Sequence, residues 1–570
     1  MDSSKSINYF FRRYSFVRWI FALALLIAIL TSIFVINSKK KIIPEIYAVI
    51  PPVGSPGDEI LIKGKGFGQE RNMSYVEIAG SKLTASAYIS WTDDCIKIIL
   101  PSNVQDGLVV VGTSNGRSKS ALFANEEEIP LPVSKVTAVT KPSILYLSSD
   151  KVNVGDILTI QGNNFGESRQ NSKVLFTADY TGKLENAAYQ NPALISDSLV
   201  KANEDFFDYV SWSDTEIKVH VPDGACTGLV AIEVNDNLSD GKALTVLKDS
   251  GNKKYFDKKV YLVEYTADID DVVSTDYSNI TLRCPLPITS VSQPRVEITE
   301  VTPEPVIANF QNDMIHQLLK IRTGAQKAIF KQTFVIDVYG VETNVNPAKI
   351  GNYRDSDASL LSIASRSDSL IKSDDERIIE LSKKIIGIEK NYYKRAQLIY
   401  NFMLENYRIL QNLRKNDADP LDMLETKEGD AYDFAIIFTA LLRAAGIPSF
   451  TDSGVLVSQD LSTQSHWWTE FYISKAGWIP CDIAIAAGLN YKKWPNDIAQ
   501  DDKKFYFGSL DSHHITFSRG WTLLKPFAAE NKVVQQPRSF ALQSIWEEAN
   551  ESTVKYSSYW SVPVVKGVYK

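Results

Sequence analysis

Cysteine and histidine are the side chains of this chain best suited to act as nucleophiles, proton carriers or metal ligands, and both are scarce. The sequence has five histidines and four cysteines, the latter being Cys95, Cys226, Cys284 and Cys481. The cysteines lack the C-x-x-C spacing of zinc and redox sites, which indicates isolated thiols rather than a disulfide framework. His513 and His514 are adjacent on a predicted strand, so their side chains face opposite ways and a shared metal is not expected. We therefore predict no metal site and no cofactor.

The overall composition is that of a large multidomain protein. At about 150 residues per domain, 570 residues suggest roughly four structural units. The chain is 44% hydrophobic and 23% charged, which is ordinary for globular proteins. Its net charge of −7 gives no global electrostatic reason to bind nucleic acid.

An apolar segment near the N-terminus departs from this composition. Residues 19–36 (WIFALALLIAILTSIFVI) are broken only by Thr31 and Ser32, and as a helix they span about 27 Å, close to the hydrocarbon thickness of a bilayer. Basic residues flank the segment on both sides, and no A-x-A-like cleavage site follows it. We predict an uncleaved signal anchor in the cell membrane, with residues 1–18 in the cytoplasm and the rest extracytoplasmic. A cleaved signal peptide is the alternative.

Two ordered blocks of sequence occur twice after this segment. GDEILIKGKGFG (57–68) returns as GDILTIQGNNFG (155–166). WTDDCIKIILPSNVQDGLVVV, from Trp91, returns as WSDTEIKVHVPDGACTGLVAI, from Trp212. Alternating apolar residues in the second block predict strands with one face on a core. The offset between copies grows from 98 to 121 residues, so the second copy carries a 23-residue insertion, which we place within residues 171–209.

The repeated blocks resemble a known family. The pattern G-D-x-x-x-I-x-G-x-x-F-G, followed by W-[ST]-D-x-x-I-x-x-x-[LV]-P, is similar to the IPT/TIG family of immunoglobulin-like β-sandwiches. The resemblance covers residues 46–124 and 143–247, which a short linker at 126–141 joins. It implies spacer or binding modules rather than catalytic ones.

The C-terminal half mixes strands with helices. Alternating and β-branched runs in residues 258–343 predict a β-rich domain. Helical periodicity follows at 376–386 and 392–406, and most clearly at 432–445, where Gly446 supplies the C-terminal stop. Further strands are predicted after this helix, in SHWWTEFYIS, in GWIPCDIA and in the residues up to Phe517.

Three motifs in this half resemble a second family. EGDAYDFAIIFTALLRAAGIPS, HWWTEFYISKAGWIPCD and YFGSLDSHHITFSRG are similar to bacterial transglutaminase-like, papain-type domains. The resemblance covers residues 376–525 and leaves 526–570 as a C-terminal extension. The predicted fold class is therefore multidomain: an N-terminal transmembrane helix, two all-β immunoglobulin-like sandwiches, a β domain and an α+β transglutaminase-like domain.

The resemblance also assigns catalytic positions. In this family a cysteine at a helix N-terminus attacks an acyl group, a histidine transfers protons and an aspartate orients the histidine. His466 and Asp482 match the second and third positions, but Ala431 occupies that of the nucleophile, and a methyl group cannot attack. Cys481 is adjacent to Asp482 on a strand and should point away, while Tyr432 carries a phenol of pKa near 10, a poor nucleophile.

We interpret the chain as a membrane-anchored, extracytoplasmic bacterial protein whose transglutaminase-like domain is inactive. Its expected partners are the membrane, through residues 19–36, and a protein, peptide or glycan of the cell envelope such as cell-wall peptide. The candidate ligand-cleft residues are Tyr432, Trp467, Trp468 and Trp478. Two alternatives stay open: an acyl-transfer or hydrolytic enzyme with a rewired nucleophile in the same cleft, and a purely structural spacer.

Overall fold

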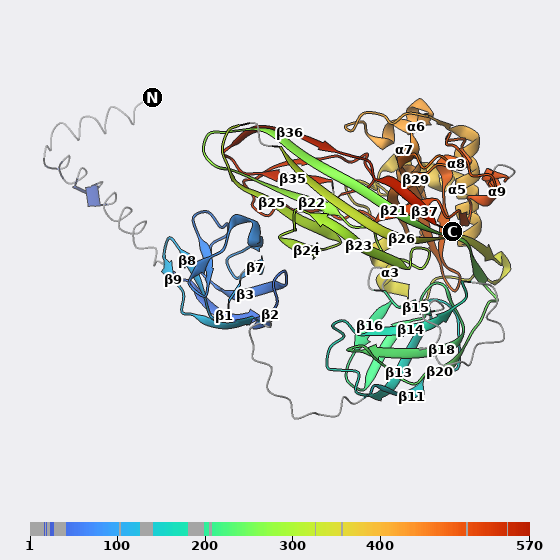
Figure 1. Cartoon of the computed structure of the whole chain (residues 1–570), viewed down its shortest axis with the longest axis horizontal. Coiled ribbons are helices and arrows are strands. Elements are labelled where there is room, and N and C mark those ends of the chain that lie inside the picture. The colour runs from blue at the N-terminus through green and yellow to red at the C-terminus, as the bar shows by residue number, and fades with distance from the viewer. Residues whose placement is uncertain are drawn as a thin grey trace. The chain divides into compact units, whose positions relative to one another are not determined.

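The computed structural model describes residues 42–569 with short gaps, together with a few helical positions between residues 16 and 27. The gaps are residues 102–103, 106, 126–140, 181–198, 204–207, 325–326, 355–356, 498–499 and 544. The predicted anchor and the residues before it thus lie largely outside the described residues. Among those that are described, no helix combines the length and apolar character needed to cross a membrane. The chain divides into two compact units, Met1–Pro130 and Leu131–Lys570 (Figure 1).

The first unit contains a β-sandwich formed by the first copy of the repeat. Its strands are β1 (Glu45–Ile50), β2 (Val53–Gly54), β3 (Glu59–Lys65), β4 (Tyr75–Ile78), β5 (Ser81–Lys82), β6 (Tyr88–Trp91), β7 (Cys95–Ile99), β8 (Gly107–Thr113), β9 (Gly116–Arg117) and β10 (Ala121–Asn125). One sheet has the order β1-β3-β7-β6, and the other has β2-β10-β8-β4-β5 with β9 beside β8. Ile96 and Ile98 of β7 are fully buried, as the alternation predicts.

The second copy of the repeat forms the same sandwich within the second unit. Its strands are β11 (Ser143–Leu147), β12 (Lys151–Val152), β13 (Ile157–Asn163), β14 (Lys173–Ala178), β15 (Leu199–Lys201), β16 (Tyr209–Trp212), β17 (Glu216–His220), β18 (Ala225–Val234), β19 (Asn237–Leu238) and β20 (Lys242–Val246). The orders β11-β13-β17-β16 and β12-β20-β18-β14-β15 repeat those of the first sandwich strand by strand. The connection from β14 to β15 is long where that from β4 to β5 is a tight turn, which places most of the insertion there.

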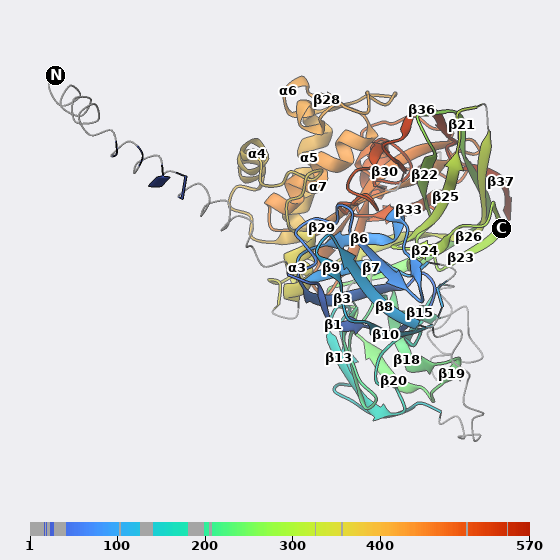
Figure 2. The same cartoon turned by 90° about the vertical axis from the view of Figure 1, so that its left-hand side faces the viewer.

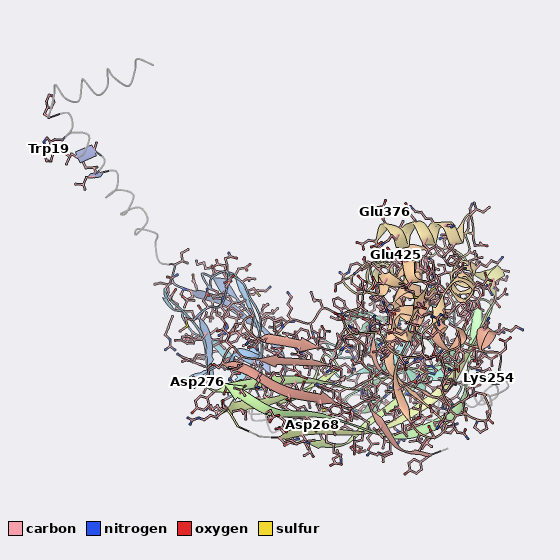
Figure 3. All side chains as sticks on the ribbon, turned by 90° about the horizontal axis from the view of Figure 1, so that it is seen from above. Trp19, Lys254, Asp268, Asp276, Glu376 and Glu425 are labelled. Carbon is pink, nitrogen blue, oxygen red and sulfur yellow. The ribbon has the colours of Figure 1, made fainter. Side chains whose placement is uncertain are left out.

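A β domain follows, and both ends of the C-terminal half contribute to it. Its strands are β21 (Gly251–Ser274), β22 (Ser278–Pro285), β23 (Arg295–Thr302), β24 (Ile307–Phe310), β25 (Asp313–Ile321), β26 (Ala328–Val345), β34 (Lys532–Gln535), β35 (Trp546–Ala549), β36 (Thr553–Trp560) and β37 (Val564–Tyr569). The main strand orders are β23-β26-β21-β36 and β24-β25-β22-β35-β34. Figure 3 shows the reach of β21, from Lys254 past Asp268 toward Asp276. Residues 526–570 are therefore not a separate extension, because their strands pair with sheet edges that would otherwise be open.

The remaining elements surround one buried helix. They are α3 (Ala358–Ala364), α4 (Glu376–Ile386), α5 (Tyr392–Asn406), β27 (Arg408–Ile409), α6 (Met423–Thr426), β28 (Glu428–Gly429), α7 (Ala431–Ala444), β29 (Ser449–Val457), β30 (Thr463–Ile473), β31 (Gly477–Cys481), α8 (Ile483–Ala486), α9 (Asp502–Phe505), β32 (Ser509–Leu510) and β33 (His514–Arg519). The sheet order is β31-β30-β29-β33. Helix α7 packs on β29 and β30 on one side and on α4 and α5 on another (Figure 2). Every residue from Ala431 to Arg443 is consequently buried.

The second sandwich and the C-terminal half share contacts within their unit. Arg354 pairs with Asp156, and the hydroxyl of Tyr180 donates to the carbonyl of Val291 at 3.1 Å. One hydrophobic core runs through both parts. The second sandwich is thus an integral part of the body that holds the candidate site.

Candidate active site

The first turn of α7 contains Ala431, which the sequence motif predicts to occupy the position of the nucleophile. Asp430 is the N-cap: its carboxylate accepts the backbone N–H of Asp433 at 3.0 Å, and the Asp433 carboxylate accepts that of Asp430, also at 3.0 Å. Ala431 is the first helical residue and is 3% exposed. A helix N-terminus lowers the pKa of a thiol placed there, but a methyl group has nothing to ionise.

Two arginines pair with the carboxylates of this turn. Arg538 donates to both oxygens of Asp430 at 2.8 and 2.9 Å and to Asp433 at 2.8 Å. Arg414 donates to the two oxygens of Asp433 at 2.7 and 2.9 Å. Burial and the neighbouring Asp433 carboxylate raise the pKa of Asp430 despite Arg538. The positive end of α7 is therefore occupied by a fixed cluster of ion pairs.

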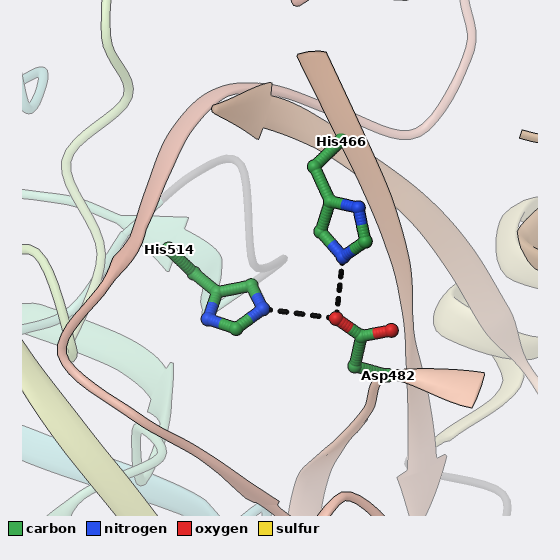
Figure 4. A group of neighbouring side chains, drawn as sticks. All are labelled: His466, Asp482 and His514. Carbon is green, nitrogen blue, oxygen red and sulfur yellow. Dashed lines mark hydrogen bonds and ion pairs between the residues drawn. The ribbon is translucent and has the colours of Figure 1, made fainter. Parts of the chain in front are cut away.

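On the sheet, two imidazoles meet one carboxylate oxygen (Figure 4). The Nε2 of His466 lies 2.5 Å from Oδ2 of Asp482, and the Nε2 of His514 lies 2.9 Å from the same oxygen. His466 is on β30, Asp482 follows β31, and His514 begins β33. Asp482 also caps α8, since its Oδ1 accepts the backbone N–H of Ile485 at 2.9 Å. All three cluster side chains are buried.

Gly454 allows this convergence across the intervening strand β29. It is paired with His466 on one side and with Thr516 on the other. A Cβ at this position would lie 1.8 Å from the carbonyl oxygen of Ile515. The close approach of β29 and β33, which carries His514, therefore requires glycine.

Asp511 completes the cluster from the far side of His514. Its Oδ1 accepts a hydrogen bond from Nδ1 of His514 at 2.8 Å, and its Oδ2 accepts one from the Tyr506 hydroxyl at 2.6 Å. Burial disfavours the imidazolium, but Asp511 and Asp482 outweigh it and raise the pKa of His514 to about 10. Burial also opposes ionisation of Asp482, yet His466 and His514 hold its pKa well below its usual range. Both ring N–H groups of His514 thus donate to carboxylates.

The other ring nitrogen of His466 makes no hydrogen bond. Within the described part of the chain Nδ1 is buried without a partner, while Nε2 contacts Asp482. Tyr432 packs against Trp467 with ring centroids 5.4 Å apart, which makes the start of α7 a neighbour of this stretch of β30. Trp467 and His466 are adjacent on β30, so this contact places α7 beside the strand but does not by itself place Ala431 against the His466 ring. The role of His466 in proton transfer remains a prediction.

Neither of the substitute nucleophiles weighed from the sequence is activated. Cys481 is buried in the hydrophobic core, and burial raises the pKa of its thiol well above the ordinary value. Burial likewise raises the pKa of the Tyr432 phenol, and Arg538, at 4.4 Å from the ring centre, only partly offsets this. Both groups are therefore protonated at neutral pH.

The four aromatic candidates do not form one shared groove in this structure. Each is at most 3% exposed: Tyr432, Trp467, Trp468 and Trp478. Trp468 instead covers the cluster, with its ring centroid 6.1 Å from that of His466 and 5.1 Å from that of His514. Trp478 borders a cavity of about 300 Å³ beside the second sandwich, which Tyr209 and Asp223 also line. These aromatic side chains pack in different places: Tyr432 and Trp467 against each other, Trp468 on the histidines, and Trp478 against Phe450 and Tyr472.

Sequence reasoning missed part of this site. His513 and His514 contact different residues, as predicted. The His513 ring stacks on Trp494 with ring centroids 4.5 Å apart, whereas His514 hydrogen-bonds to Asp482. His514 and Asp511 lie within the third motif, but their membership of the cluster follows from the path of β33 beside β29, which the motif does not reveal. Arg538 comes from a segment far along the chain and carries no local signal. In the sequence, the spacing of Asp511 three residues before His514 was a local hint of their contact.

Comparison with known families agrees with these observations. Residues 379–483 match the transglutaminase-like superfamily, and residues 44–124 match the IPT/TIG domain. The chain contains a transglutaminase-like domain. The domain includes α7, His466 and Asp482, whereas His514, Asp511 and Arg538 lie beyond the matched residues.

Individual relatives match only parts of the chain. An uncharacterized protein of Haemophilus influenzae is 28% identical over 166 residues, which are 24% of this chain and 45% of that protein. A cyclomaltodextrin glucanotransferase of Paenibacillus macerans is 34% identical over 82 residues, 14% of this chain and 11% of that enzyme. The chain thus spans less than half the length of these curated relatives. A solved structure from Cytophaga hutchinsonii, described as a candidate cysteine protease, is 14% identical with a TM-score of 0.34, covering 55% of this chain and 94% of that one.

Proposed function

We propose that this protein is a membrane-anchored, extracytoplasmic binding or scaffolding protein whose transglutaminase-like domain has lost its nucleophile. The observation that carries the proposal is Ala431 at the first position of α7. The ion pairs of Asp430 and Asp433 with Arg538 fill the surrounding turn. The expected ligand is an envelope protein or cell-wall peptide, and residues 19–36 are the proposed anchor.

A place for a ligand exists outside the buried cluster. The cavity of about 300 Å³ that Trp478 borders is also lined by Arg169, Lys173 and Asp208. Its mixture of aromatic, basic and acidic groups suits a polar peptide or glycan better than an apolar molecule. Binding there would need no chemistry from the transglutaminase-like site.

The unpartnered Nδ1 of His466 favours one second candidate, a hydrolase without a protein nucleophile. In that reaction His466 would take a proton from a water molecule as its oxygen attacks an amide carbonyl. It would return the proton to the leaving amine when the C–N bond breaks. This candidate predicts that His466→Ala abolishes turnover.

The proposal is tested with the purified full chain by two assays. The first measures incorporation of a labelled amine into a glutamine-containing protein and cleavage of cell-wall peptide; we expect neither. Turnover that disappears in His466→Ala would overturn the proposal in favour of the hydrolase. The second assay is alkaline extraction of membranes, in which we expect the chain to stay with the lipid. Release into the soluble fraction would refute the anchor.

A further inference from the structure

The His466, Asp482 and His514 cluster has the donor set of a divalent-metal site. Its three potential ligand atoms all lie within 4.8 Å of one another; two come from strands β30 and β33, and Asp482 comes from the turn between β31 and α8. Imidazole nitrogen and carboxylate oxygen are ligands that suit Zn²⁺ and its neighbours in the first transition row. Figure 4 shows both rings turned edge-on toward the same carboxylate oxygen.

The groups that hydrogen-bond to His514 and Asp482 are of the kind that orient the ligands in metal sites. Asp511 accepts from Nδ1 of His514 at 2.8 Å and so fixes the ring with Nε2 toward Asp482. Histidine ligands in metal sites are commonly held in this way by a carboxylate on the opposite nitrogen. Asp482 is held in turn by the backbone N–H of Ile485, which leaves Oδ2 facing the two rings.

We propose that His466, Asp482 and His514 bind a divalent transition-metal ion of the zinc class. The separations of 2.5 and 2.9 Å between donor atoms compare with about 3.3 to 3.5 Å for two ligands of a tetrahedral zinc ion with bonds near 2.0 to 2.1 Å. Side-chain rotations that open each contact by less than about 1 Å would admit the ion in place of the protons now between the groups. The bound ion would tie β30, β31 and β33 together. This site goes beyond the proposed function, since it does not depend on what the domain binds elsewhere.

Space for a further ligand lies beside the cluster. A small cavity of about 20 Å³ is bordered by His514, Asp511 and Trp468. That volume accommodates about one water molecule. A water molecule is the usual fourth ligand where a protein supplies three to zinc.

The test is metal content and coordination in the full chain. The protein is stripped with a chelator, reloaded with Zn²⁺ or Co²⁺, freed of unbound metal by gel filtration and measured by plasma mass spectrometry. We expect about one tightly held ion per chain, visible ligand-field bands with Co²⁺, and zinc X-ray absorption showing imidazole and oxygen ligands without thiolate. Wild-type protein that retains no ion, or a zinc site with sulfur ligands, would overturn the proposal.

Matched variants locate the ion. Asp482→Asn preserves the size of the side chain and should abolish retention, as should His514→Gln. His513→Gln changes the adjacent histidine, whose ring stacks on Trp494 instead, and should leave the ion in place. Asp511→Asn should weaken binding by about 10- to 100-fold. Retention of the ion by folded Asp482→Asn would refute the site, with circular dichroism reporting the fold of each variant.

Discussion

The first turn of α7 and the strand cluster around Asp482 are both buried and charged, but they are built differently. At the helix, two carboxylates are matched by Arg538 and Arg414, and these ion pairs include no group suited to transfer a proton at neutral pH. In the cluster, two imidazoles share the carboxylate of Asp482, and one ring nitrogen stays without a partner among the described residues. On our proposal that Ala431 replaces a nucleophile, the comparison teaches that such a loss does not require loss of the charged groups elsewhere in the domain. The ion pairs at the helix end stabilise the fold, whereas the cluster retains groups that can bind a metal ion or transfer a proton.

Arg538→Met tests the helix half of the comparison and should have the largest effect. The substitution leaves Asp430 without its cation and Asp433 with only Arg414, and both carboxylates are almost fully buried. Breaking a buried pair in this way costs about 3 to 5 kcal/mol. Urea denaturation would measure this loss as a lower free energy of unfolding in the transition assigned to the second unit. Arg414→Met is the control and should cost less, because Asp433 keeps Arg538; equal losses would contradict this account of the turn.

Asp511→Asn tests the cluster half and should cost about 1.5 to 3 kcal/mol in metal-free protein, the range for hydrogen bonds to charged groups. The direction in which the stability changes with pH follows from the raised pKa of His514. Since the folded pKa of His514 is raised to about 10, its contribution to stability is complete below an unfolded pKa of about 6.5 and is lost as pH rises toward 10. The variant should flatten that decline. A wild-type stability that does not fall between these pH values would show that His514 is not held as an imidazolium.

His466→Gln should have the smallest effect on stability, about 1 kcal/mol or less in chelator-treated protein. It weakens the contact with Asp482 but also removes a buried nitrogen that has no partner in the described structure. Thermal unfolding beside the Asp511→Asn variant gives the comparison. A loss larger than that of Asp511→Asn would mean that His466, not His514, anchors the cluster.

Much of the fold was predictable because it repeats or has a strong period. The two sandwiches follow from sequence blocks in the same order, and α4 and α5 have the bounds that periodicity predicts, 376–386 and 392–406. The contribution of residues 526–570 to the β domain was not predictable, since strand pairing across some 270 residues leaves no local pattern.

The site was predictable only in its motif residues. The motifs assign predicted roles to His466, Asp482 and Ala431. They contain His514 and Asp511 without giving them a role, and Arg538 lies outside them; tertiary packing brings these three into place. The four predicted aromatic residues do not form one cleft, and of them only Trp478 borders the cavity of about 300 Å³, because a motif specifies aromatic residues without specifying which side of the sheet is covered. Trp467 is buried against Tyr432 of α7, and Trp468 against His514 of β33, contacts that only the tertiary structure sets.

The central claim is that the site lacks its nucleophile and little else, and Ala431→Cys tests it most directly. In the full chain, reaction with a thiol probe is followed residue by residue by mass spectrometry across a pH series. The helix N-terminus and His466 should lower the pKa of the introduced thiol below about 8.5, so it should react faster at neutral pH than Cys95 or Cys226. This advantage should shrink in an Ala431→Cys, His466→Gln double variant. An introduced thiol that reacts no faster than those two native cysteines would contradict the claim.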